Sequence, residues 1–136
     1  MSRDHRLEDL AAVFVGLAHG ADGSMHFLEF TQIADHLIRW KDPGDETDVL
    51  ELVDETVARH SPPFVLRAVE RLAKTMSERE LRAVMEDLSQ LALADRKFLR
   101  EEAEYIVWVA NHWKITDSGV GGGAFSSVLR AAWAGL

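Results

Sequence analysis

Apolar residues recur every three or four positions along most of the chain, which is the spacing of one face of an α-helix. The first such stretch runs from Leu7 to Ala18, and Gly20 is expected to end this helix. The second runs from Phe27 to Trp40 and leads into a loop that contains Pro43 and Gly44. No stretch shows the strict alternation of a half-buried β-strand, so the pattern predicts helices throughout.

Capping residues indicate where the third helix begins. Thr47 or Asp48 is expected to cap it, because both side chains accept hydrogen bonds from the first helical amides. Its inward-facing residues are then Leu50, Val53 and Val57.

The remaining helices follow from similar signals. Ser61, followed by two prolines, marks the start of a fourth helix, and Ser77 with Glu80 forms a capping box that begins a fifth. A sixth is expected from about Leu99 to Trp113, then a glycine-rich hinge over 116–124 and a last helix over 125–134. We therefore predict an all-α protein, a single domain over 1–136 with a core over about 7–115. Its fold is a compact bundle of about seven helices built from two similar helical hairpins.

Two of the predicted helix junctions share one plan. Asp22, followed by Gly23, precedes Glu29 by seven residues, and Asp95 precedes Glu102 by seven residues as well. One common offset relates the two pairs and also aligns apolar residues around them. The spacing matches the second half of an EF-hand loop, in which glycine permits the turn and the late glutamate reaches back to calcium.

Neither junction completes that loop. The positions for the first two carboxylates hold Ala18 and Gly20 in one copy and Leu91 and Leu93 in the other, and Arg96 replaces the glycine of the second copy. Two half-loops on packed hairpins would still bring four carboxylates together, and a divalent cation would offset their mutual repulsion. The alternative is structural, with the aspartates capping helical turns and the glutamates binding loop amides.

Composition narrows the function. With 15 Lys and Arg against 23 Asp and Glu, the net charge is -8, which disfavours nucleic-acid binding. The chain has no cysteine, which excludes disulfides, thiolate zinc sites and cysteine nucleophiles. It begins with no signal peptide, and no apolar run approaches the ~18 residues of a membrane span. A cytoplasmic protein that does not span a membrane is expected.

Charge is also unevenly distributed. An acidic run extends from Asp42 to Glu55, whereas the stretch from Arg59 to Arg82 contains six Arg and Lys. Such a polarised surface could bind a protein of complementary charge. Alternatively, both stretches are solvent-exposed helix faces on which acidic and basic side chains four residues apart form ion pairs. The six histidines form no H-E-x-x-H motif and are expected to be surface or cap residues.

The doubled junction, Ala21–Asp22–Gly23 to Glu29 and Ala94–Asp95 to Glu102, resembles the TerB-like family of tellurite-resistance proteins. The resemblance covers about Leu7 to Ile115 and departs from the family pattern at Arg96. It implies an all-helical fold of two related halves, with acidic residues at the junctions that are suspected of binding a divalent metal. It also implies a link to tellurite resistance and stress-response complexes.

The functional hypothesis is a non-enzymatic cytoplasmic TerB-like module that acts through protein partners in tellurite or stress response. Its metal ligands would be Asp22, Glu29, Asp95 and Glu102. The bound ion would be calcium, magnesium, manganese or zinc. The sequence predicts no catalytic residue and no cofactor other than this ion. It does not indicate the oligomeric state. The alternatives are a metal-dependent hydrolase with a carboxylate as general base, or a purely structural helical bundle that binds partners.

Overall fold

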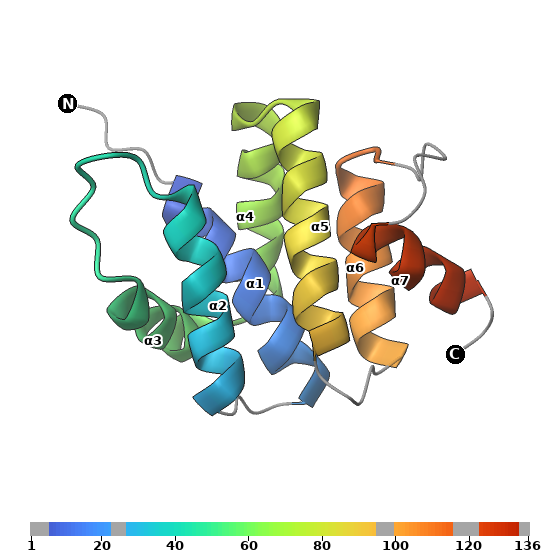
Figure 1. The fold of residues 1–136 in the computed structure, drawn as a ribbon, viewed down its shortest axis with the longest axis horizontal. Coiled ribbons are helices and arrows are strands. Elements are labelled where there is room, and N and C mark those ends of the chain that lie inside the picture. Colours follow the sequence, from blue (N-terminus) through green and yellow to red (C-terminus); the bar gives the residue numbers. More distant parts are fainter. Residues whose placement is uncertain (1–5, 23–26, 95–99, 116–122, 134–136) are drawn as a thin grey trace. The chain divides into compact units, whose positions relative to one another are not determined.

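The computed structural model describes the backbone of residues 6–22, 27–94, 100–115 and 123–133, and the side chains of 6–18, 29–94, 100–115 and 123–130. This part of the chain contains seven α-helices and no strand, which confirms the predicted all-α class (Figure 1). The helices are α1 (Arg6–Asp22), α2 (Phe27–Trp40), α3 (Val49–Arg59), α4 (Pro62–Thr75), α5 (Glu78–Ala94), α6 (Arg100–His112) and α7 (Ala124–Trp133).

The chain divides into two compact units, Met1–Thr75 and Met76–Leu136, which we call unit 1 and unit 2. Each contains one of the two expected hairpins. In unit 1 the 17-residue α1 is followed by the 14-residue α2, and in unit 2 the 17-residue α5 is followed by the 13-residue α6. The single domain over 1–136 stays a prediction, because the chain forms two compact units.

Helix α1 is the central helix of unit 1, since it contacts α2, α3 and α4. Residues 9–18 of α1 are all buried, and Phe14 and Leu10 are among the largest fully buried side chains. A helix that is apolar around its whole circumference must be covered on all sides, which explains its central place.

Two sequence predictions for unit 1 were wrong. Gly20 does not end the first helix, which continues to Asp22, because a single glycine costs a helix only about 1 kcal/mol relative to alanine. In α3, Asp48 is the N-cap as predicted, but Leu50 is 48% exposed. The buried face of α3 consists instead of Val49, Val53 and Thr56.

In unit 2 the predicted capping box begins α5. The Ser77 amide donates to the Glu80 carboxylate at 2.9 Å, and the Glu80 amide donates to the Ser77 hydroxyl at 3.2 Å. Helix α5 then buries Leu81, Val84 and Leu88. Its remaining buried apolar residues are Met85, Leu91 and Ala92.

Helix α7 packs against both α5 and α6 (Figure 1). Its N-terminus is held by a carboxylate from α5: Glu86 accepts hydrogen bonds from the amides of Ala124 at 2.6 Å and Phe125 at 3.2 Å. A carboxylate satisfies orphan amides and complements the positive end of the helix dipole. Gly123 leaves room for it, because a Cβ at this position would lie 2.7 Å from a Glu86 carboxylate oxygen.

Helix α6 ends in a left-handed turn at Lys114, whose φ is 56°. The Ile115 amide donates to the Ala110 carbonyl at 2.9 Å, which is the long bond of a Schellman motif. Glycine is the usual residue at the left-handed position, so Lys114 holds a conformation that is unfavourable for a side chain.

Candidate functional site

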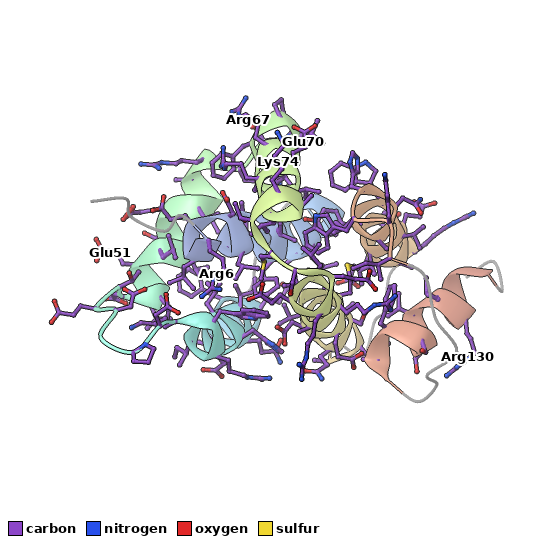
Figure 2. All side chains as sticks on the ribbon, turned by 90° about the horizontal axis from the view of Figure 1, so that it is seen from above. Arg6, Glu51, Arg67, Glu70, Lys74 and Arg130 are labelled. Atoms are coloured by element: carbon purple, nitrogen blue, oxygen red, sulfur yellow. The ribbon has the colours of Figure 1, made fainter. Side chains whose placement is uncertain are left out.

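The described side chains of unit 1 surround a groove of about 1080 Å³, between the start of α1, the loop 41–48, α3 and α4. We call it the acidic groove, because seven of its lining residues carry carboxylates. They are Glu8, Asp9, Asp42, Asp45, Asp48, Glu51 and Glu55. Its basic lining residues are Arg59 and Arg71. Figure 2 shows the lining residue Glu51 on α3 and, outside the lining, Arg6 at the start of α1.

Local hydrogen bonds shape the loop that forms one wall of the acidic groove. The Asp45 carboxylate accepts from the Thr47 amide at 2.9 Å and from the Thr47 hydroxyl at 2.6 Å. The Lys41 ammonium donates to the Thr47 carbonyl at 2.8 Å. Gly44 provides the turn with a φ of 88°, which glycine adopts without a steric cost. The last groove carboxylate of the loop, Asp48, caps α3 by accepting from the Leu50 amide at 3.1 Å.

Two ion pairs connect α1 to the other walls. The Arg71 guanidinium donates to the Asp9 carboxylate through Nε, at 3.2 and 3.1 Å, and through Nη2 at 2.7 Å. The Asp9 side chain is 7% exposed and the Arg71 side chain 53%. Hydrogen bonding to Asp9 raises the pKa of Arg71 above its usual value, so the guanidinium keeps its positive charge. The Arg6 guanidinium donates to the Asp42 carboxylate at 3.0 Å, which connects α1 to the loop 41–48.

Two groove carboxylates differ from the others. Glu51 and Glu55 lie one turn apart on α3 and are both exposed. Neither carboxylate has a hydrogen bond or ion pair with any residue that the structure describes. Like charges four residues apart repel on a helix, so this edge of the acidic groove attracts cationic groups.

The predicted junction residues lie elsewhere. Glu29 and Glu102 are each the third residue of their helix, α2 and α6, which is the equivalent position in the two hairpins. Glu29 is half-buried and Glu102 is only 4% exposed. Each has a hydrogen bond, ion pair or other electrostatic interaction within the chain. The side chain of Asp22 and the whole of Asp95 lie outside the described residues.

A carboxylate in the first turn is stabilised by the positive end of the helix dipole, so both glutamates have a structural reason for their position. Among the described residues, no group of three or more His, Asp or Glu could hold a metal ion. Since two of the four expected ligands lie outside that set, the metal site at the junctions stays a prediction.

Of the three histidines whose side chains the structure describes, His36, His60 and His112, one departs from expectation. His112 is exposed and packs edge-on against Trp108, with ring centroids 4.7 Å apart. His36, in contrast, is buried against Phe14, with centroids 6.3 Å apart. An imidazole is apolar enough over its ring face to join a core when its polar atoms find partners.

Comparison with known proteins identifies the family. The model of the family described as tellurite resistance protein TerB matches residues 8–121. The chain belongs to the TerB family. No curated protein and no solved structure shows significant similarity to it.

The TerB match spans both helix junctions and six of the helices, α1 to α6. It also spans most of the acidic groove, from Glu8 to Arg71. Helix α7 begins at Ala124, beyond the matched residues, and is joined to the TerB part of unit 2 through Glu86. None of the described helices is long and apolar enough to cross a membrane.

Sequence reasoning found only part of the acidic groove. The acidic run from Asp42 to Glu55 was visible as a charged stretch, and it supplies five of the seven groove carboxylates. The contribution of Asp9 was missed, because its partner Arg71 lies 62 residues away and no local pattern links the two. The one available signal was an acidic residue within an otherwise apolar helix, since a buried carboxylate needs a cationic partner.

Proposed function

We propose that this TerB-family chain is a non-catalytic cytoplasmic module that binds a divalent cation at its helix junctions and acts through protein partners in tellurite or stress response. The observation that carries the proposal is the equivalent placement of Glu29 and Glu102 as third residues of α2 and α6. Two carboxylates at matching points of a repeated hairpin point to a repeated task, and Glu102 is buried.

The donor chemistry fits a hard cation. The junctions offer carboxylate oxygens, from Asp22 and Glu29 in one hairpin and Asp95 and Glu102 in the other. Calcium, magnesium and manganese prefer such oxygen ligands, whereas zinc prefers sulfur and nitrogen. The chain has no cysteine. Calcium, magnesium or manganese is therefore favoured over zinc.

A non-catalytic role follows from what the site residues offer. The residues proposed as ligands at the junctions are all carboxylates, and the absence of cysteine excludes cysteine nucleophiles. The acidic groove consists largely of carboxylates that already serve the fold as cap, loop and ion-pair residues. These features support a role in binding rather than in catalysis.

The cation is tested by thermal unfolding of chelator-stripped protein with calcium, magnesium, manganese or zinc added. A cation at about a hundredfold its dissociation constant should stabilise the protein by roughly 2.7 kcal/mol. Glu29→Gln and Glu102→Gln should abolish this stabilisation. Asp35→Asn on α2 and Glu101→Gln on α6 are matched controls, because both remove an exposed carboxylate from the same helices. The proposal fails if no cation raises the midpoint, or if the controls remove the effect equally.

A further inference from the structure

Apolar and acidic side chains both line the acidic groove. We call its apolar lining residues, Leu7, Leu52 and Phe64, the floor and its carboxylates the border; Leu7 is buried, and Leu52 and Phe64 are half-buried. Apolar side chains that remain partly exposed inside a concave surface are suited to contact with another apolar group. The border carries the carboxylates of the loop 41–48 and of α3.

The charge of the border is only partly compensated within the chain. Asp9 is paired with Arg71 and Asp42 with Arg6. Glu51 and Glu55, both on α3, have no such partner among the described residues and line the acidic groove. Seven carboxylates against two guanidinium groups leave the lining strongly negative. A cationic occupant would remove the repulsion between the two glutamates.

The spread of its charges decides between occupants of the groove. At about 1080 Å³, the acidic groove lies at the upper end of the roughly 300–1,000 Å³ of small-molecule pockets, so its volume also accommodates part of a peptide. Its carboxylates do not converge, since the described residues contain no three acidic or histidine side chains grouped as metal ligands. Charges that are distributed around an apolar floor match cations spaced along a chain, rather than a single ion.

We propose that the acidic groove docks a segment of a partner protein in which Lys or Arg alternates with apolar residues. The apolar side chains contact Leu52 and Phe64, and the cationic side chains pair with Glu51 and Glu55. Arginine is especially suited, because its planar guanidinium binds a carboxylate through two parallel hydrogen bonds. The inference deepens the proposed partner-dependent role of the chain and rests on it, but it is independent of the cation at the junctions.

The test measures binding of the full chain to a fluorescent nine-residue peptide of alternating arginine and leucine at physiological salt. The groove variant is Glu51→Gln/Glu55→Gln. The matched control is Asp54→Asn/Glu70→Gln, which removes two exposed carboxylates from α3 and α4 of unit 1 that do not line the groove. Loss of two charge-assisted contacts should weaken binding by about tenfold or more in the groove variant, and by less than about twofold in the control.

Two further probes test the chemistry of the occupant. A peptide of alternating arginine and glycine should bind more weakly than the arginine–leucine peptide, because it does not contact the floor. Spermine and magnesium, added as competitors, should displace the peptide only in large excess. The inference is overturned if the peptide does not bind, if both variants lose affinity equally, or if either small cation binds the groove as tightly as the peptide does.

The outcomes separate this inference from the proposed junction site. The cation-dependent shift of the unfolding midpoint is measured on the same protein and depends on Glu29 and Glu102, neither of which lines the acidic groove. A retained shift without peptide binding overturns the docking inference alone. Peptide binding without a cation shift supports the docking inference and overturns the junction site alone.

Discussion

The ion pair between Asp9 and Arg71 gives the sharpest prediction for the stability of unit 1. Arg71→Ala removes all three hydrogen bonds to a carboxylate whose side chain is only 7% exposed. Asp9→Ala removes the same bonds, but it leaves a guanidinium that is 53% exposed and is therefore hydrated by water. The two single variants should differ in cost for that reason.

The expected magnitude follows from the burial of each partner. Removing one partner of a fully buried pair costs about 3–5 kcal/mol, and hydrogen bonds to charged groups contribute about 1.5–3 kcal/mol. Because Arg71 is half-exposed, the lower range applies. We expect Arg71→Ala to lower the free energy of unfolding by about 2–3 kcal/mol and Asp9→Ala by about 1–2 kcal/mol. The double variant should cost about 1 kcal/mol less than the sum.

The assay is urea unfolding of the full chain, followed through the fluorescence of Trp40. This is the tryptophan of unit 1, so replacing Trp108, Trp113 and Trp133 with phenylalanine isolates its signal. Arg67→Ala is the matched control, since this exposed α4 arginine has no ion-pair partner among the described residues. It should change stability by less than about 0.5 kcal/mol.

Either of two results would refute the reasoning about this ion pair. If Arg71→Ala costs no more than Arg67→Ala, the pair contributes nothing to unit 1. If Asp9→Ala costs more than Arg71→Ala, burial of the carboxylate does not determine the asymmetry.

Three further predictions concern helix ends. Glu86→Ala should lower the free energy of unfolding of unit 2 by about 2 kcal/mol in denaturant unfolding, because α7 loses a charged cap. Gly123→Ala should also be destabilising, since its Cβ meets that carboxylate. If Glu86→Ala left the stability unchanged, the proposed anchoring of α7 would be contradicted. Asp48→Ala should cost about 1 kcal/mol by the same measurement, whereas Asp54→Ala, in the exposed middle of α3, should be nearly neutral. Lys114→Gly should raise the thermal midpoint, with a gain of about 1 kcal/mol from relief of the left-handed conformation, and an unchanged or lower midpoint would count against strain there.

The sequence predicted helices well where caps and periodicity agreed. Ser77 and Glu80 form the expected reciprocal bonds, and the predicted apolar face of α5 is buried. The prediction of the buried face failed where two adjacent apolar residues both fit the helical spacing. Val49 and Leu50 are adjacent apolar residues that both lie three or four positions before Val53, so the spacing alone could not decide which one faces the core.

The candidate sites divide along the same physical line. The doubled Asp-to-Glu spacing predicts two equivalent junctions, because a repeat is a property of the sequence itself, and Glu29 and Glu102 hold the same position in α2 and α6. The acidic groove depends on Asp9 meeting Arg71 and on Leu7 and Phe64 lining one hollow, and these contacts exist only once α1 and α4 have packed. Reading one stretch at a time cannot reveal contacts of that range.

The loop 41–48 has a consequence for how recognition by this fold can diversify. Lys41, Asp45 and Thr47 hold its turn through bonds to one another. At its ends the Lys41 amide donates to the Ile38 carbonyl of α2 and Asp48 caps α3, and the exposed pair between Arg6 and Asp42 connects it to α1. The residues between Lys41 and Asp48 can therefore be exchanged as a unit if these two end residues are kept. Replacing this segment would change one wall of the groove while the packing of α1 against α4 is kept. This loop is therefore the segment to randomise when TerB-family proteins are selected for new binding preferences.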